Sequence, residues 1–174
     1  MTAAARDMEV AALPRWLPAY VGVGSNLEDP ARQVKRALES LSRLPGTRRV
    51  SESALYRTKP FGEVVQPAFV NAVAGLLTQR SPEELLADLR VLETELGRAP
   101  PRERWGPRVI DLDLLVLGCE IRGTGTLTLP HAGIAERDFV LYPLADVAPD
   151  LEVPGLGAVR DLRTRVVNRG IEKL

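Results

Sequence analysis

The sequence predicts an α+β protein with a ferredoxin-like β-α-β-β-α-β sandwich followed by a C-terminal extension. Three observations support this fold class. Short apolar segments alternate with two helical segments, each helical segment begins with a capping residue followed by proline, and no internal repeat interrupts the order. In this fold two helices cover one face of an antiparallel sheet. Because the fold hosts many activities, function has to be argued from particular residues.

The first half of the chain contains one predicted helix between strands. The helix follows Asp29-Pro30, a capping residue with proline at the first helical position, and it stops at Pro45-Gly46. The elements expected here are a strand at 19–24, a helix at 30–44, strands at 50–58 and 69–78, and a loop at 59–67 that contains proline and glycine.

The second half opens with the second helix. Ser81-Pro82-Glu83-Glu84 has the pattern of a capping box, and Gly97 closes the helix. The elements expected here are a helix at 82–96, a strand at 109–117, a glycine-rich turn near 123–125, a strand at 127–129 and a short helix at 134–141. The tail after Pro154 is only weakly patterned.

Composition limits the classes of protein to which the chain can belong. Its 174 residues suit one domain, which we expect to span residues 19–174 after an N-terminal extension at 1–18. The formal net charge is zero, so we expect neither nucleic acid nor membrane partners. The single cysteine, Cys119, and the lack of a secretory pattern predict a cytoplasmic protein, and we expect a monomer.

Asp111 and Asp113 are the most informative residues for chemistry. Side chains on a strand alternate between faces, so these two carboxylates point the same way, with Cα atoms about 6.6 Å apart. Their neighbours at 109–117 are apolar, which makes two like charges costly unless a cation compensates. The alternative is a half-exposed strand with two solvated carboxylates. We favour a site for Mg²⁺, which prefers oxygen ligands.

Arginines gather just before this strand, at Arg98, Arg102, Arg104 and Arg108. The cluster is either a solvated, arginine-rich loop or a clamp for polyphosphate, because guanidinium groups match phosphate oxygens. Carboxylates beside arginines suit phosphoryl transfer. The chain has no Walker loop, and Gly22-Val23-Gly24 lacks the third glycine of a dinucleotide fingerprint.

Three further residues stand out when position alone is considered, and for two of them the interpretation stays open. His131, the only histidine, is either a surface residue or a functional one. Phe139 is a candidate core residue. Asn71 lies within an apolar strand, where its amide either bridges structural elements or reads the edge of a heterocycle.

These residues together resemble a known family. The segment Arg104-Trp105-Gly106-Pro107-Arg108, followed by Asp111-Leu112-Asp113, is similar to the signature of 6-hydroxymethyl-7,8-dihydropterin pyrophosphokinases. The resemblance covers about residues 19–155. It also includes Gly24-Ser25-Asn26-Leu27, Tyr56-Arg57-Thr58, Gln66-Pro67, Asn71, Leu129-Pro130-His131 and Arg137-x-Phe139.

The resemblance implies an enzyme that transfers pyrophosphate from ATP to a hydroxymethyl-dihydropterin in folate biosynthesis. It implies two Mg²⁺ ions held by Asp111 and Asp113, with Arg98 and Arg108 as catalytic residues. The residues implied on the ATP side are Glu93, Arg104, Trp105, Leu114, Thr128, His131 and Arg137. The residues implied on the pterin side are Thr58, Pro60, Phe61, Phe69, Asn71 and Phe139.

The sequence departs from the family pattern at a few positions. Pro100-Pro101 replaces residues that are often basic, Ala132 replaces a larger residue, and Phe69 replaces a frequent tyrosine. Two other classes of protein also fit the fold. One is a nucleotidyl transferase with paired metals on a ferredoxin-like sheet, which leaves AMP attached to its product. The other is a ferredoxin-like binding module, which would present exposed aromatic residues and a basic surface.

Overall fold

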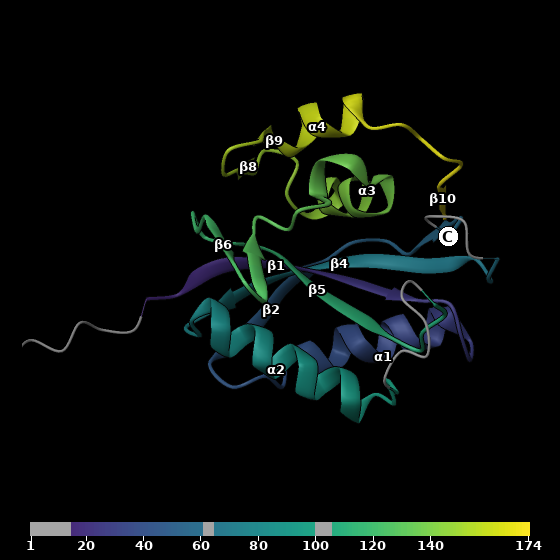
Figure 1. The fold of residues 1–174 in the computed structure, drawn as a ribbon, viewed down its shortest axis with the longest axis horizontal. Coiled ribbons are helices and arrows are strands. Elements are labelled where there is room, and N and C mark those ends of the chain that lie inside the picture. Colours follow the sequence, from purple (N-terminus) through teal and green to yellow (C-terminus); the bar gives the residue numbers. More distant parts are fainter. Residues whose placement is uncertain (1–14, 61–64, 100–105) are drawn as a thin grey trace, which may run out of the picture.

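The computed structural model describes residues 15–60, 65–99 and 106–174, and an antiparallel sheet lies at their centre (Figure 1). The strands of this sheet are β1 (Leu17–Ser25), β2 (Thr47–Glu52), β3 (Tyr56–Thr58), β4 (Phe69–Thr78), β5 (Asp111–Leu117) and β10 (Glu172–Lys173). They are ordered β10-β3-β4-β1-β5, and β2 pairs with the other half of β4. With β2 and β3 counted as one strand, this is the predicted ferredoxin-like order.

Helices cover both faces of the sheet, as Figure 1 shows. One face packs on α1 (Pro30–Leu41) and α2 (Pro82–Glu95), the two predicted helices. The other face packs on α3 (Asp138–Val147) and α4 (Val159–Arg165) from the C-terminal part of the chain. The smaller elements are the hairpin of β6 (Arg122–Thr124) and β7 (Leu127–Leu129), the hairpin of β8 (Glu152–Val153) and β9 (Gly157–Ala158), and the 3₁₀ helix η1 (Ile134–Glu136).

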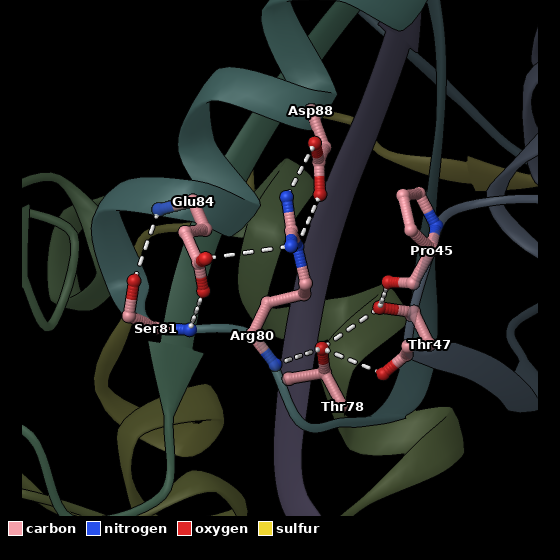
Figure 2. Close-up of polar contacts among 8 residues, drawn as sticks. Pro45, Thr47, Thr78, Arg80, Ser81, Glu84 and Asp88 are labelled. Atoms are coloured by element: carbon pink, nitrogen blue, oxygen red, sulfur yellow. Dashed lines mark hydrogen bonds and ion pairs between the residues drawn. The ribbon is translucent and has the colours of Figure 1, made fainter.

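The entry to α2 is fixed by local polar contacts (Figure 2). The Ser81 hydroxyl accepts a hydrogen bond from the Glu84 backbone, and the Glu84 carboxylate accepts one from the Ser81 backbone, so the predicted capping box forms. Arg80 donates to both carboxylate oxygens of Asp88, at 2.8 and 3.1 Å. Its backbone N–H also donates to Thr78, the last residue of β4. These contacts fix the angle at which the chain leaves the sheet.

Several predicted boundaries were wrong. The strand expected at 50–58 is two strands, because the Ser53 hydroxyl and backbone bond to Val73 where the chain turns from β2 to β3. The first strand begins at Leu17, so Leu17 and Pro18 belong to the sheet instead of the expected extension. The predicted helix at 134–141 is a 3₁₀ turn followed by α3, which continues to Val147.

The weakly patterned tail also contains regular structure. It forms α4 and then β10, which pairs with the edge of β3. Most of the expected N-terminal extension lies outside the described residues, which begin at 15. Among the described helices, none is both long and apolar enough to cross a membrane.

Candidate active site

Asp111 and Asp113 lie on one face of β5, as predicted. They pair across the sheet with Gly24 and Gly22 of β1, while Leu112 between them packs into the core under α1 and α2. The two carboxylates therefore face the α3 side of the sheet. Because glycine has no side chain, β1 itself places no side chain beside either acid on this face.

Asp111 is held by the two arginines that the sequence marked as catalytic. Arg98 Nη1 donates to Asp111 Oδ1 at 2.8 Å, and Arg108 Nη1 donates to Asp111 Oδ2 at 2.9 Å. Both arginines are largely buried, with side chains 25 % and 20 % exposed. A predicted metal ligand and two predicted phosphate ligands thus form one ion-paired group.

Glu93, on α2, joins this group from the opposite side of β5. Its Oε1 accepts a 2.7 Å hydrogen bond from the Leu112 backbone N–H and a further hydrogen bond from Arg98. Burial raises the pKa of Glu93, although the Leu112 N–H and the Arg98 charge both favour the carboxylate. Glu93 therefore ties helix, strand and guanidinium together.

Asp113 has a different environment from Asp111. Burial, followed by the negative charge of Asp111, raises the pKa of Asp113 to about 7. His131 Nε2 lies 3.9 Å from Asp113 Oδ1, which is beyond hydrogen-bond distance. The Gly133 backbone N–H donates to His131 Nδ1 at 3.1 Å, so in the neutral ring the proton is on Nε2 and faces Asp113. Burial and the Arg137 charge lower the pKa of His131.

Two cavities meet at the aspartate pair. The first lies between the sheet and α3, and the predicted pterin-side residues Thr58, Phe69, Asn71 and Phe139 line it. The second extends towards α2 and β7, and the predicted ATP-side residues Glu93, Leu114, Thr128, His131 and Arg137 line it together with Arg98. Asp111, Asp113, Arg108 and Arg137 line both cavities. The acids and two arginines thus lie where two ligands would meet.

The chain matches known proteins over most of its length. The family model described as 7,8-dihydro-6-hydroxymethylpterin-pyrophosphokinase matches residues 20–149. The chain belongs to this family. Its relatives include the 2-amino-4-hydroxy-6-hydroxymethyldihydropteridine pyrophosphokinases of Pseudomonas aeruginosa and Haemophilus influenzae. They are 45 % and 40 % identical to this chain, over 89 % and 91 % of its length and 95 % and 98 % of their own.

Solved structures show the same fold at much lower identity. The wild-type HPPK-DHPS of Plasmodium falciparum aligns with a TM-score of 0.68 at 13 % identity. The alignment covers 89 % of this chain but only 45 % of that longer protein. At this low sequence identity, the structural similarity shows only that the two proteins share a fold.

The floor of the first cavity was not predicted from the sequence. Gly22 and Gly24 line it, and an added Cβ at Gly24 would lie 2.8 Å from Asn71 Oδ1. The Asn71 amide donates to the Thr58 hydroxyl at 2.7 Å, so Asn71 bridges β3 and β4 and also lines the cavity. Glycine within a strand often marks a place where another group approaches the backbone closely. The two glycines of the predicted strand at 19–24 could therefore have indicated this contact from the sequence. In this member of the pyrophosphokinase family, Gly24 provides room for the Asn71 carbonyl.

Asn26, at the end of the first turn, is a second residue whose role the sequence left unassigned. Its Oδ1 accepts from the Arg108 backbone N–H at 2.9 Å, and its Nδ2 donates to Gln66 and to the Pro67 carbonyl. Asn26 is buried at 2 % exposure. It therefore fixes Arg108 relative to Gln66, which lines the first cavity.

A few predicted site residues are not placed at the cavities. Phe61, Arg104 and Trp105 lie outside the described residues, as do Pro100 and Pro101. Pro60 is described, but it is not among the residues that line either cavity. Ala132 lines the second cavity, so a small side chain borders the predicted ATP side.

Proposed function

We propose that the chain transfers the pyrophosphoryl group of ATP to 6-hydroxymethyl-7,8-dihydropterin, in folate biosynthesis. The observation that carries the proposal is that two cavities share Asp111, Asp113, Arg108 and Arg137. One cavity has aromatic and amide groups suited to a flat heterocycle, and the other has arginines and a histidine suited to phosphates. The names of the relatives and of the family support this pair of substrates.

The carboxylate pair fits Mg²⁺. Asp113 is a carboxylate whose pKa is raised by burial and by Asp111, and a bound cation would offset that repulsion. Among the described residues, no group of three or more His, Cys, Asp or Glu side chains is arranged so that it could hold a metal ion. We therefore propose that Asp111 and Asp113 supply the protein ligands for two ions and that ATP oxygens and water complete the coordination. The bound ions would neutralise phosphate charge and lower the pKa of the attacking hydroxyl.

In the proposed reaction the pterin hydroxymethyl oxygen attacks the β-phosphorus of ATP. A new bond forms between that oxygen and phosphorus, the bond from the β-phosphorus to the α,β-bridging oxygen breaks, and AMP leaves with the electron pair. The hydroxyl proton passes to solvent. Arg98 and Arg108 would turn from Asp111 towards the phosphates, and His131 and Arg137 would hold the nucleotide.

The pterin side depends on the residues of the first cavity. Phe69 and Phe139 would stack on the ring, and Asn71 with Thr58 would read its polar edge. We assign Phe61 to the pterin side and Arg104 and Trp105 to the ATP side on the resemblance of the sequence alone. We also expect a monomer in the cytoplasm, where the exposed free thiol of Cys119, the one cysteine in the sequence, would stay reduced.

One assay tests the proposal. The purified chain is incubated with Mg²⁺, ATP and 6-hydroxymethyl-7,8-dihydropterin, and the nucleotide products are separated. Release of AMP with stoichiometric pterin pyrophosphate is the expected result. ADP as the product, or AMP attached to the pterin as a nucleotidyl transferase would leave it, would refute the proposal.

A further inference from the structure

The C-terminal tail, residues 166–174, lies against the wall of the first cavity. The family match ends at residue 149, so this segment is outside it. In Figure 1 the tail leaves α4 and descends past α3 to the edge of the sheet, where β10 forms. Glu172 and Lys173 pair with Arg57 and Tyr56 of β3, and the Leu174 N–H donates to the Leu55 carbonyl at 2.9 Å.

The tail also contacts the start of α3 through a buried carboxylate. Asp138 is only 3 % exposed. Its Oδ1 accepts from the Phe139 backbone N–H at 2.8 Å, and its Oδ2 accepts from the Arg169 backbone N–H at 2.8 Å. One carboxylate thus joins the first turn of α3 to the tail, and a buried carboxylate that loses such partners is costly.

A tight turn allows the tail to make both contacts. The Asn168 side chain accepts hydrogen bonds from the backbone N–H groups of Gly170 and Ile171, at 2.8 and 3.2 Å. Gly170 has φ of +87°, a conformation that other residues rarely adopt. The turn therefore redirects the chain from Asp138 towards β3. Gly170 lies beside the Lys59 side chain, which lines the first cavity.

The two anchoring points lie on different walls of the same cavity. Asp138 is flanked by Arg137 and Phe139, which line the cavity from the α3 side. β10 pairs with β3, which ends at Thr58. The Thr58 side chain lines the cavity from the sheet side. A further link is Asp146 of α3, which accepts from the Tyr56 hydroxyl at 2.9 Å and pairs with Lys173 at 3.4 Å.

We propose that Asp138 and the tail form a clamp that positions Phe139 against β3 for binding of the flat heterocycle. Asp138 acts here as a positioning residue, since it contacts the backbone of its neighbours and not the cavity. The heterocycle as ligand rests on the proposed function, but the clamp itself does not. A side chain that is already held in place loses less conformational entropy when a ligand binds. The clamp therefore strengthens binding of the ligand on the pterin side only.

The clamp is tested first without any ligand, by amide hydrogen exchange. Asp138→Ala should speed exchange in residues 139–141, and a chain ending at Val166 should do so in these residues and in β3, each by about tenfold or more. Glu172→Ala is the matched control, since its exposed carboxylate pairs with Arg57 while the backbone pairing of β10 remains. Unchanged exchange in folded Asp138→Ala protein would overturn the clamp, whatever the protein binds.

Calorimetry then tests the consequence for binding. With a nonhydrolysable MgATP analogue present, Asp138→Ala should raise the Kd of 6-hydroxymethylpterin by roughly three- to tenfold, the cost of ordering one or two side chains. The Kd of the analogue should change less than about twofold, because the second cavity lies on the other side of the acids. Equal losses on both sides, or none for the pterin, would contradict the positioning role. Failure of the wild-type chain to bind pterin would instead refute the proposed function.

Discussion

The carboxylate of Glu93 accepts a 2.7 Å hydrogen bond from the backbone N–H of Leu112, the residue between the two aspartates of β5. The same carboxylate oxygen accepts from Arg98, which in turn donates to Asp111. A single side chain on α2 therefore sets the position of the strand that carries both acids and the orientation of one arginine. Glu93, which the sequence predicts to lie beside ATP, therefore also has a structural role.

We expect Glu93→Ala to lower the free energy of unfolding by about 1–3 kcal/mol, because it leaves the buried Leu112 N–H without an acceptor. Glu93→Gln is the matched control, since an amide oxygen still accepts from Leu112 and should recover much of the loss. Urea unfolding of the three proteins measures this difference. Equal stability of the Ala and Gln variants would show that the hydrogen bond to Leu112 is not what Glu93 contributes.

Asp113→Ala should abolish magnesium-dependent turnover, with a loss of about 10³-fold or more, while the protein stays folded. The variant lacks a proposed ligand but also lacks the repulsion with Asp111. Steady-state rates and thermal melts are measured on the same samples. Asp150→Ala, which removes an exposed carboxylate paired with Arg160, is the control. Normal turnover in folded Asp113→Ala protein would refute the metal assignment.

Stability without magnesium should fall as the pH rises from about 4 to about 7 because of Asp113. Its pKa is about 7 in the folded protein and near 3.8 otherwise, so the folded state binds more protons in this range. The stabilisation is complete below the lower value and lost above the higher one. Asp113→Asn should therefore gain stability relative to the wild type across this range. Urea unfolding in chelator at several pH values measures the difference, and parallel curves would show that Asp113 does not titrate there.

Arg98→Ala and Arg108→Ala should each slow the chemical step by about 10²–10³-fold and weaken ATP binding much less. Both guanidinium groups donate to Asp111, one of the two acids beside which charge would redistribute during transfer. Arg108→Lys should recover only part of the loss, because a point charge cannot replace a planar group. Single-turnover rates and ATP dissociation constants separate the two effects. If the Kd for ATP rose by the same factor as the rate fell, the arginines would serve mainly to bind ATP in the ground state, and the prediction would be wrong.

Gly24→Ala should weaken binding of 6-hydroxymethylpterin by about tenfold or more, because the new Cβ would lie 2.8 Å from Asn71 Oδ1 and displace that side chain. Gly22→Ala is the matched control on the same strand. Its Cβ would meet the Leu115 side chain at 3.5 Å, an ordinary contact. Calorimetry in the presence of an ATP analogue compares the two. A stronger effect at Gly22 would show that the cavity floor, and not Asn71, governs binding.

Local signals in the sequence determined the two helices under the sheet, the strand at 69–78 and the shared face of Asp111 and Asp113. Caps, proline positions and alternation of side chains act over a few residues, so they can be read directly. The motif around Arg108 and the aspartates also determined the family, which the comparisons confirm. The roles of individual site residues remain predictions.

Only the tertiary structure decided which residues far apart in the chain meet. The hydrogen bond from Leu112 to Glu93, the contacts of Asn26 with Gln66 and Arg108, and the approach of Gly24 to Asn71 depend on strand order and register. The return of the tail to β3 depends on a turn at 168–170 and on pairing with an edge strand. Such contacts arise where separate elements pack together. The periodic pattern within one segment shows which face is buried but not which residues of another segment that face will meet.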